Sequence, residues 1–67
     1  MINNEERAFT LLIILMSKYV KNKKFNNSFS ANDYLEQCNG VLMCMSSLGL
    51  ITDKECKEAY DTLLNYK

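Results

Sequence analysis

The chain has 67 residues, and its eight basic residues balance its eight acidic ones, so its formal net charge is zero at neutral pH. Such a chain lacks the basic excess that draws proteins to nucleic acids or anionic membranes. It contains no histidine and only three cysteines. These counts leave too few soft ligands for a four-coordinate zinc site and no histidine base for nucleophilic catalysis.

A chain this short buries about 60% of the surface that its unfolded form exposes, so we expect one marginally stable domain, spanning 1–67. Oligomerisation is a usual remedy. The cysteines are an odd set and the N-terminus lacks a signal-peptide pattern, which favours reduced thiols in the cytoplasm. We expect Cys38, Cys44 and Cys56 to be small buried apolar residues. The longest mainly apolar run, 8–16, is shorter than the ~20 residues that cross a bilayer.

Turn signals concentrate in two places, the polar stretch 22–30 and Gly49, and the chain has no proline. This punctuation predicts three helices, at about 4–24, 31–48 and 53–66. The fold class that follows is all-α, as a small three-helix bundle.

The first predicted helix has an unusually wide apolar face. Its apolar residues cover roughly 200° of the helix circumference, whereas a surface helix needs a stripe of about 100°. These residues are Phe9, Leu11, Leu12, Ile13, Leu15, Met16, Tyr19 and Val20. Ile14 interrupts the polar seam on the other side of the helix, where water is expected.

Two short partner helices leave part of this face uncovered, so we hypothesise that a second copy covers it in a symmetric homodimer. The predicted dimer interface consists of Phe9, Leu12, Ile13, Ile14, Met16 and Val20. The alternative is that this helix is the central one of a monomeric bundle, with Ile14 as a tolerated exposed residue.

The second predicted helix opens with Ser30 as its N-cap, in a weak capping box with Asp33. Before it, Phe25 and Phe29 flank a polar turn, and we expect both aromatic rings to fold back onto the core. Its apolar stripe covers about 180° of the helix. The stripe consists of Tyr34, Leu35, Cys38, Val41, Leu42, Met45 and Leu48.

The opposite side of the second helix carries a candidate partner-binding surface. Glu36, Gly40, Met43 and Ser47 align at spacings of four, three and four residues. Gly40 costs the helix about 1 kcal/mol relative to alanine. The gap at Gly40 beside the flexible thioether of Met43 suits the entry of a partner's side chain or helix. The alternative is that Gly40 marks only a weak point or kink.

The third predicted helix starts with the T-x-x-E capping box formed by Thr52 and Glu55. Its apolar stripe is Cys56, Ala59, Tyr60, Leu63 and Leu64. Together with the turn at Gly49 it resembles a helix-turn-helix, whose second helix enters the major groove of DNA. Its acidic residues are Asp53, Glu55, Glu58 and Asp61. Because phosphates repel these carboxylates, a DNA-binding regulator is only our alternative interpretation.

The segment GLITDKECKEAYDTLL also resembles the short C-terminal helical module known as SHOCT. The residues that match are Gly49, Ile51, Thr52, Asp53, Glu55, Leu63 and Leu64. Cys56 stands where that module usually has an aromatic residue. The resemblance covers about a quarter of the chain and implies oligomerisation or docking.

A short chain rich in asparagine, lysine, isoleucine and tyrosine is also similar to small accessory proteins of phages and plasmids of low-GC bacteria. Many of those proteins bind and block a host protein, including components of antiviral defence. The resemblance implies the same for this chain, and no catalytic constellation, metal site or cofactor motif competes with it. We therefore expect a non-catalytic interaction protein that binds and inhibits or regulates a host protein. A helical protein that holds a small ligand between its subunits is a further alternative.

Overall fold

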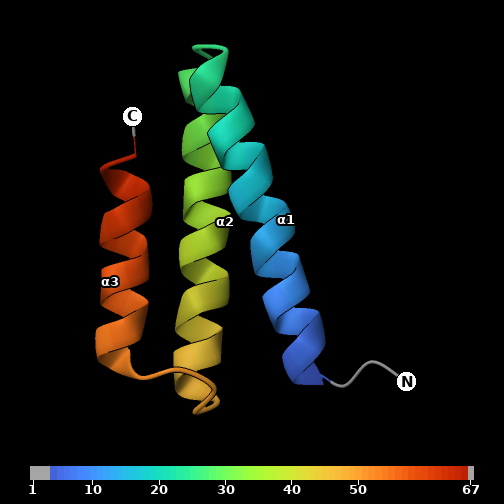
Figure 1. Cartoon of the computed structure of the whole chain (residues 1–67), viewed down its shortest axis with the longest axis vertical. Coiled ribbons are helices and arrows are strands. Elements are labelled where there is room, and N and C mark those ends of the chain that lie inside the picture. The colour runs from blue at the N-terminus through green and yellow to red at the C-terminus, as the bar shows by residue number, and fades with distance from the viewer. Residues whose placement is uncertain (1–3, 67) are drawn as a thin grey trace.

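The computed structural model describes residues 4–66, and these form three α-helices. They are α1 (Asn4–Lys24), α2 (Ser28–Ser47) and α3 (Asp53–Leu64). The all-α class and the three predicted helices are confirmed. α2 lies between α1 and α3 (Figure 1), so the prediction that the first helix is the central one was wrong in its placement. The molecule measures 35 × 28 × 14 Å, which makes it a thin layer of helices.

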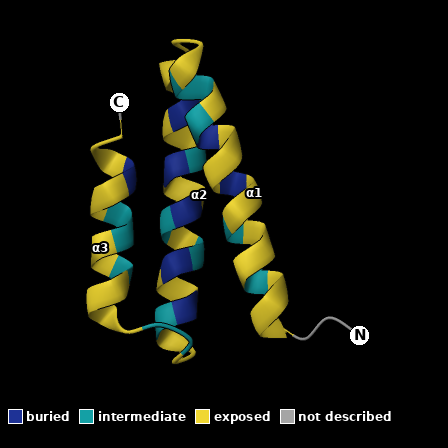
Figure 2. Cartoon of the chain, viewed as in Figure 1, coloured by how far each residue is buried: buried dark blue, intermediate teal, exposed yellow. Residues whose placement is uncertain are grey.

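The core is centred on α2, because this helix is packed from two sides. The buried residues are Leu15, Tyr19, Ala31, Leu35, Cys38, Leu42, Met45 and Leu63. Five of these eight belong to α2, and they run along most of its length in Figure 2. The predicted stripe on this helix therefore faces the core, except at its end, where Leu48 is 74% exposed. Figure 1 shows why, since α1 diverges from α2 toward this end of the molecule.

α1 and α3 meet near their C-terminal ends, beside the α1–α2 turn. The Tyr19 hydroxyl donates a buried hydrogen bond of 2.6 Å to the Leu63 carbonyl. Lys23 Nζ donates an exposed hydrogen bond of 2.6 Å to the carbonyl of Tyr66, whose ring centroid lies 6.4 Å from that of Tyr19. These contacts hold the end of α3 against α1 although α2 separates the two helices elsewhere.

The connection between α1 and α2 is shorter than predicted. Asn26 adopts a left-handed backbone conformation with φ 59°, which asparagine tolerates better than most residues. The next residue, Asn27, is the N-cap of α2, and its side chain accepts from the amide of Ser30 at 3.4 Å. The prediction of a Ser30 cap was therefore wrong, because an asparagine three residues earlier is an equally good cap.

This earlier start changes the position of the two loop aromatics. Phe29 now lies in the first turn of α2 and is 81% exposed, while Phe25 in the turn is 70% exposed. The prediction that both rings fold onto the core was wrong. Phe29 precedes Glu36 by seven residues, about two helical turns, so it shares the outer face of α2.

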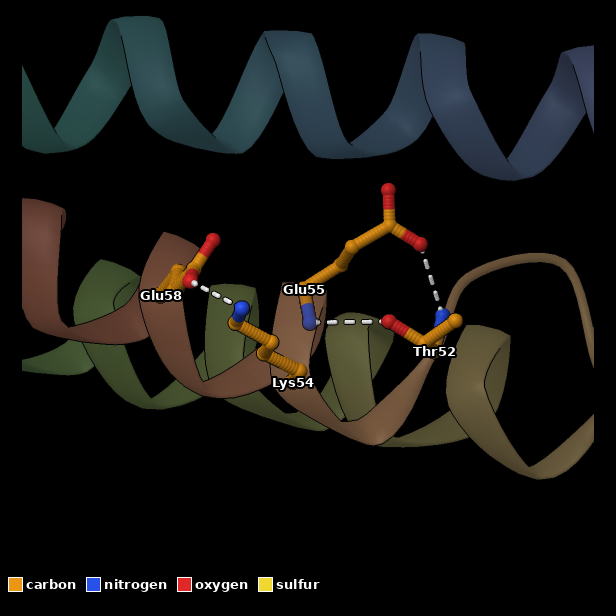
Figure 3. A network of polar contacts seen from close by, with 4 residues as sticks. All are labelled: Thr52, Lys54, Glu55 and Glu58. Atoms are coloured by element: carbon orange, nitrogen blue, oxygen red, sulfur yellow. Dashed lines mark hydrogen bonds and ion pairs between the residues drawn. The ribbon is translucent and has the colours of Figure 1, made fainter.

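The α2–α3 connection matches the sequence prediction closely. Gly49 has φ 76°, and the Leu50 amide donates to the Met45 carbonyl at 2.9 Å, which closes a Schellman motif at the end of α2. The Thr52–Glu55 capping box is complete: the Glu55 amide donates to Thr52 Oγ1 at 3.1 Å, and the Thr52 amide donates to Glu55 Oε1 at 2.9 Å (Figure 3). α3 ends at Leu64, two residues earlier than predicted, and Leu64 is exposed.

The cysteines differ from one another in exposure. Cys38 is fully buried, and burial raises the pKa of its thiol. Cys56 is half-buried and Cys44 is exposed, so the prediction that all three are buried holds for Cys38 alone. All three are free thiols. Among residues 4–66, no helix has the length and hydropathy required to cross a membrane.

Candidate functional site

The predicted dimer interface lies on the surface of α1. Its members divide by exposure: Phe9, Ile13, Ile14 and Met16 are exposed, and Leu12 and Val20 are half-buried. The most exposed of them is Ile13, at 62%. α2 and α3 therefore cover one side of α1 and leave the remaining apolar side chains in contact with water.

Helix geometry sorts these exposed side chains into two groups. Phe9, Ile13, Met16 and Val20 are separated by four, three and four residues, so they follow one line along the helix, which we call the α1 stripe. Ile14 lies about 100° around the helix from Ile13, outside this stripe. The predicted interface residues thus do not form one continuous surface.

A shallow hollow of about 560 Å³ runs along the C-terminal half of the α1 stripe. It is lined by Ile13, Met16, Ser17, Val20, Lys21, Lys24 and Phe25. The apolar stripe is therefore bordered by lysines at this end. The exposed ring of Phe25 extends the same apolar surface beyond the helix.

A second apolar surface, which the sequence did not predict, lies between α1 and α2. This α1–α2 groove has a volume of about 510 Å³. It is lined by Ala8, Leu11, Leu15, Gln37, Gly40, Val41, Cys44, Met45 and Leu48. Gln37 is the one residue in its lining with a charged or amide side chain, so an occupant would make mainly apolar contacts.

The candidate partner-binding residues are exposed, but they border different hollows. Gly40 lines the α1–α2 groove, whereas Met43 and Ser47 line a hollow of about 400 Å³ between α2 and α3. Glu36 is exposed on the outer face of α2. Met43 is 57% exposed, and its sulfur accepts a weak hydrogen bond from Asn39 at 3.7 Å.

Gly40 has no packing role in the fold of this chain. A Cβ atom built at this position meets no neighbour within 4 Å, and its backbone φ is not positive. Neither close approach nor backbone conformation therefore requires glycine. What Gly40 does provide is an open side of the α1–α2 groove, where a larger side chain would occupy the space.

Several charged groups of α3 make contacts with their own helix. Hydrogen bonds from the Thr52 backbone and hydroxyl hold the pKa of Glu55 below its ordinary value. Glu58 lies 3.9 Å from Lys54 in an exposed i,i+4 pair (Figure 3). Within residues 4–66, no group of three or more possible metal ligands comes together. The α1 stripe and the α1–α2 groove, by contrast, offer mainly apolar contacts.

Comparison with known proteins leaves the function to be argued from these surfaces, because no protein-family model, curated protein or solved structure matches the chain.

Proposed function

We propose that this protein is a non-catalytic interaction module that forms a homodimer and binds a second, different protein. The observation that carries the proposal is the exposure of apolar side chains on α1 after α2 and α3 have packed. The large ones are Phe9, Leu11, Ile13, Ile14 and Met16. Exposed apolar patches of this kind, here along the α1 stripe and in the α1–α2 groove, mark interaction sites in soluble proteins.

The two apolar surfaces of α1 suit two different occupants. The α1 stripe is a narrow line on one helix, as in helices that pair with another helix. The α1–α2 groove is wider, and its open side at Gly40 admits a side chain or a helix from another protein. In our proposal the second copy covers the stripe and the target protein occupies the groove, with Glu36, Met43 and Ser47 on the adjoining outer face of α2.

The narrower form of the proposal is an accessory protein of a phage or mobile element. It would act in the cytoplasm by binding and inhibiting or regulating a host protein, such as a defence component. Its support is the small size and the composition of the chain, which is rich in asparagine and lysine. The SHOCT-like segment from Gly49 to Leu64 supports the same class of function, because that resemblance implies oligomerisation or docking.

The start of α3 is poorly suited to bind DNA. The amides of Thr52 and Glu55 at the start of this helix, which would otherwise be available to a phosphate, are already bonded to the side chains of the capping box. Glu55 completes the capping box with Thr52, and Asp53 accepts a hydrogen bond from the Ser46 hydroxyl. A phosphate approaching this end of α3 would meet two carboxylates.

Affinity capture of the tagged protein from its natural host, with and without nuclease, tests the proposal. We expect a protein partner whose recovery is unaffected by nuclease. Gly40→Leu should abolish capture by filling the groove, while Thr62→Leu, which adds the same side chain on the exposed face of α3, should not. Nuclease-sensitive recovery of DNA, or unchanged capture by Gly40→Leu, would contradict the proposal.

A further inference from the structure

The α1 stripe has the same spacing when it is followed in either direction. Phe9, Ile13, Met16 and Val20 are separated by four, three and four residues, which is the alternation of a and d positions in a heptad repeat. The pattern is symmetric about the point midway between Ile13 and Met16. An antiparallel copy of α1 would therefore place Phe9 opposite Val20 of the partner subunit and Ile13 opposite Met16 of the partner subunit.

The charges of α1 have a matching arrangement. Its first turn contains Glu5 and Glu6, and its last turn contains Lys21, Lys23 and Lys24. Lys24 follows Glu6 by about five complete turns, so these two residues lie along the same edge of the stripe. An antiparallel copy would bring the acidic turn of each helix beside the basic turn of the other, at both ends. A parallel copy would place like charges together.

From these two observations we infer that two copies of the chain pair through α1 in the antiparallel direction. The two-fold axis passes midway between Ile13 and Met16. In this register the residue numbers of two facing positions always sum to 29, as for Phe9 with Val20 of the partner subunit. The inference rests on the homodimer of the proposed function and adds its direction and register. A second copy is the occupant that the stripe fits, because the charge pattern at the two ends of α1 complements itself.

This pairing leaves the α1–α2 groove open. The stripe and the groove lie on different sides of α1, and Leu11, which lines the groove, is about 160° around the helix from Ile13. A dimer through the stripe would therefore present two copies of the groove, related by the two-fold axis. Self-association and binding of a target would not compete.

Disulfide trapping between full-length chains tests the register. Phe9→Cys and Val20→Cys are introduced separately in a background with Cys44→Ser and Cys56→Ser, which leaves Cys38 fully buried. The two variants are mixed and oxidised, and their cross-linked products are separated by mass. We expect the Phe9–Val20 pairing to exceed either self-pairing by about tenfold, because in this register two copies of position 9 lie ~16 Å apart along the axis, beyond the reach of a disulfide.

The outcomes separate the register from the dimer itself. Sedimentation equilibrium that finds a monomer at high micromolar concentration would overturn the homodimer and the inference with it. A dimer in which position 9 cross-links to position 9 and position 20 to position 20 would be parallel. A dimer that forms no cross-link would use another surface. Either result would overturn the inference and leave the homodimer in place.

A second pair of variants does not depend on oxidation. Ile13→Lys places a charge in the stripe, and Ile14→Lys places the same charge on the adjacent exposed isoleucine outside it. We expect Ile13→Lys to be monomeric with unchanged circular dichroism, and Ile14→Lys to remain dimeric. Equal dissociation of both variants would contradict the assignment of the interface to the stripe.

Discussion

The hydroxyl of Tyr19 donates a buried hydrogen bond of 2.6 Å to the main-chain carbonyl of Leu63, and this contact joins the first helix to the last. The Leu63 carbonyl also accepts from the amide of Tyr66 at 3.1 Å. It therefore serves both the C-terminal cap of α3 and the packing of α3 against α1. Few other contacts join these two helices, so this one hydroxyl contributes much of the attachment of α3 to α1.

Removing that hydroxyl should loosen the attachment of α3. We expect Tyr19→Phe to lower the free energy of unfolding by about 1–2 kcal/mol, because a buried hydrogen bond is lost while the carbonyl keeps one partner. Tyr34→Phe is the matched control at a half-buried tyrosine of α2, with an expected change within about 0.5 kcal/mol. Urea denaturation of the three proteins measures both values. Equal losses in both variants would show that the Tyr19–Leu63 bond contributes little.

The capping box predicts an acid-sensitive start of α3. The folded pKa of Glu55 lies below its ordinary value of 4.5, so its carboxylate adds stability above that value and loses it as the pH falls through the lowered pKa. Glu55→Gln should therefore flatten the fall in melting temperature between about pH 5 and pH 3. Glu58→Gln, in the exposed pair with Lys54, should keep the native profile. A native pH profile in Glu55→Gln would contradict this role.

The two glycines should respond in opposite ways to alanine. Gly40→Ala should stabilise the protein by about 1 kcal/mol, because an added Cβ meets no neighbour and alanine favours the helix. Gly49→Ala should destabilise it by about 1 kcal/mol, because φ at this position is 76°. Thermal unfolding monitored by circular dichroism gives both signs. Destabilisation by Gly40→Ala would mean that the glycine has a role in folding.

Met43 provides a test of the outer face of α2 that leaves the fold intact. Met43→Lys should change the free energy of unfolding by less than about 0.5 kcal/mol, because the side chain is largely exposed. It should weaken binding of the captured partner at least about tenfold, since a charge would replace an apolar contact. Thr62→Lys on α3 is the control, and titration calorimetry measures the affinity. Unchanged affinity in Met43→Lys would remove Met43 from the binding surface.

The parts of this fold that could be predicted from sequence are those that local chemistry determines. Thr52 and Glu55 define the start of α3 because both halves of the capping box occur within four residues. The start of α2 was predicted wrongly at Ser30, because Asn27 is an equally good cap type and the left-handed Asn26 leads directly into it. Periodicity revealed the excess apolar face of α1, but not which helix lies in the centre.

The α1–α2 groove could not be predicted from apolar periodicity, because periodicity does not give the angle between packed helices. Leu11 and Leu48 both belong to apolar stripes, and each was a reasonable core residue in an ideal bundle. Both are exposed where α1 and α2 diverge toward that end of the molecule (Figure 1). Helix crossing geometry depends on the shapes of the interdigitating side chains, and these are not encoded in an apolar pattern.

The small contribution of α3 to the core has a consequence for local unfolding. Among the described residues, this helix contributes one buried side chain, that of Leu63, whereas α2 contributes five. Detaching α3 therefore exposes less apolar area than separating α1 from α2. Amide protons of α3 should exchange with solvent through an opening that costs less free energy than global unfolding, and those of α2 should exchange only when the whole chain unfolds. In that case the helical hairpin of α1 and α2 is the cooperative folding unit, and α3 undocks and unfolds locally while the hairpin stays folded.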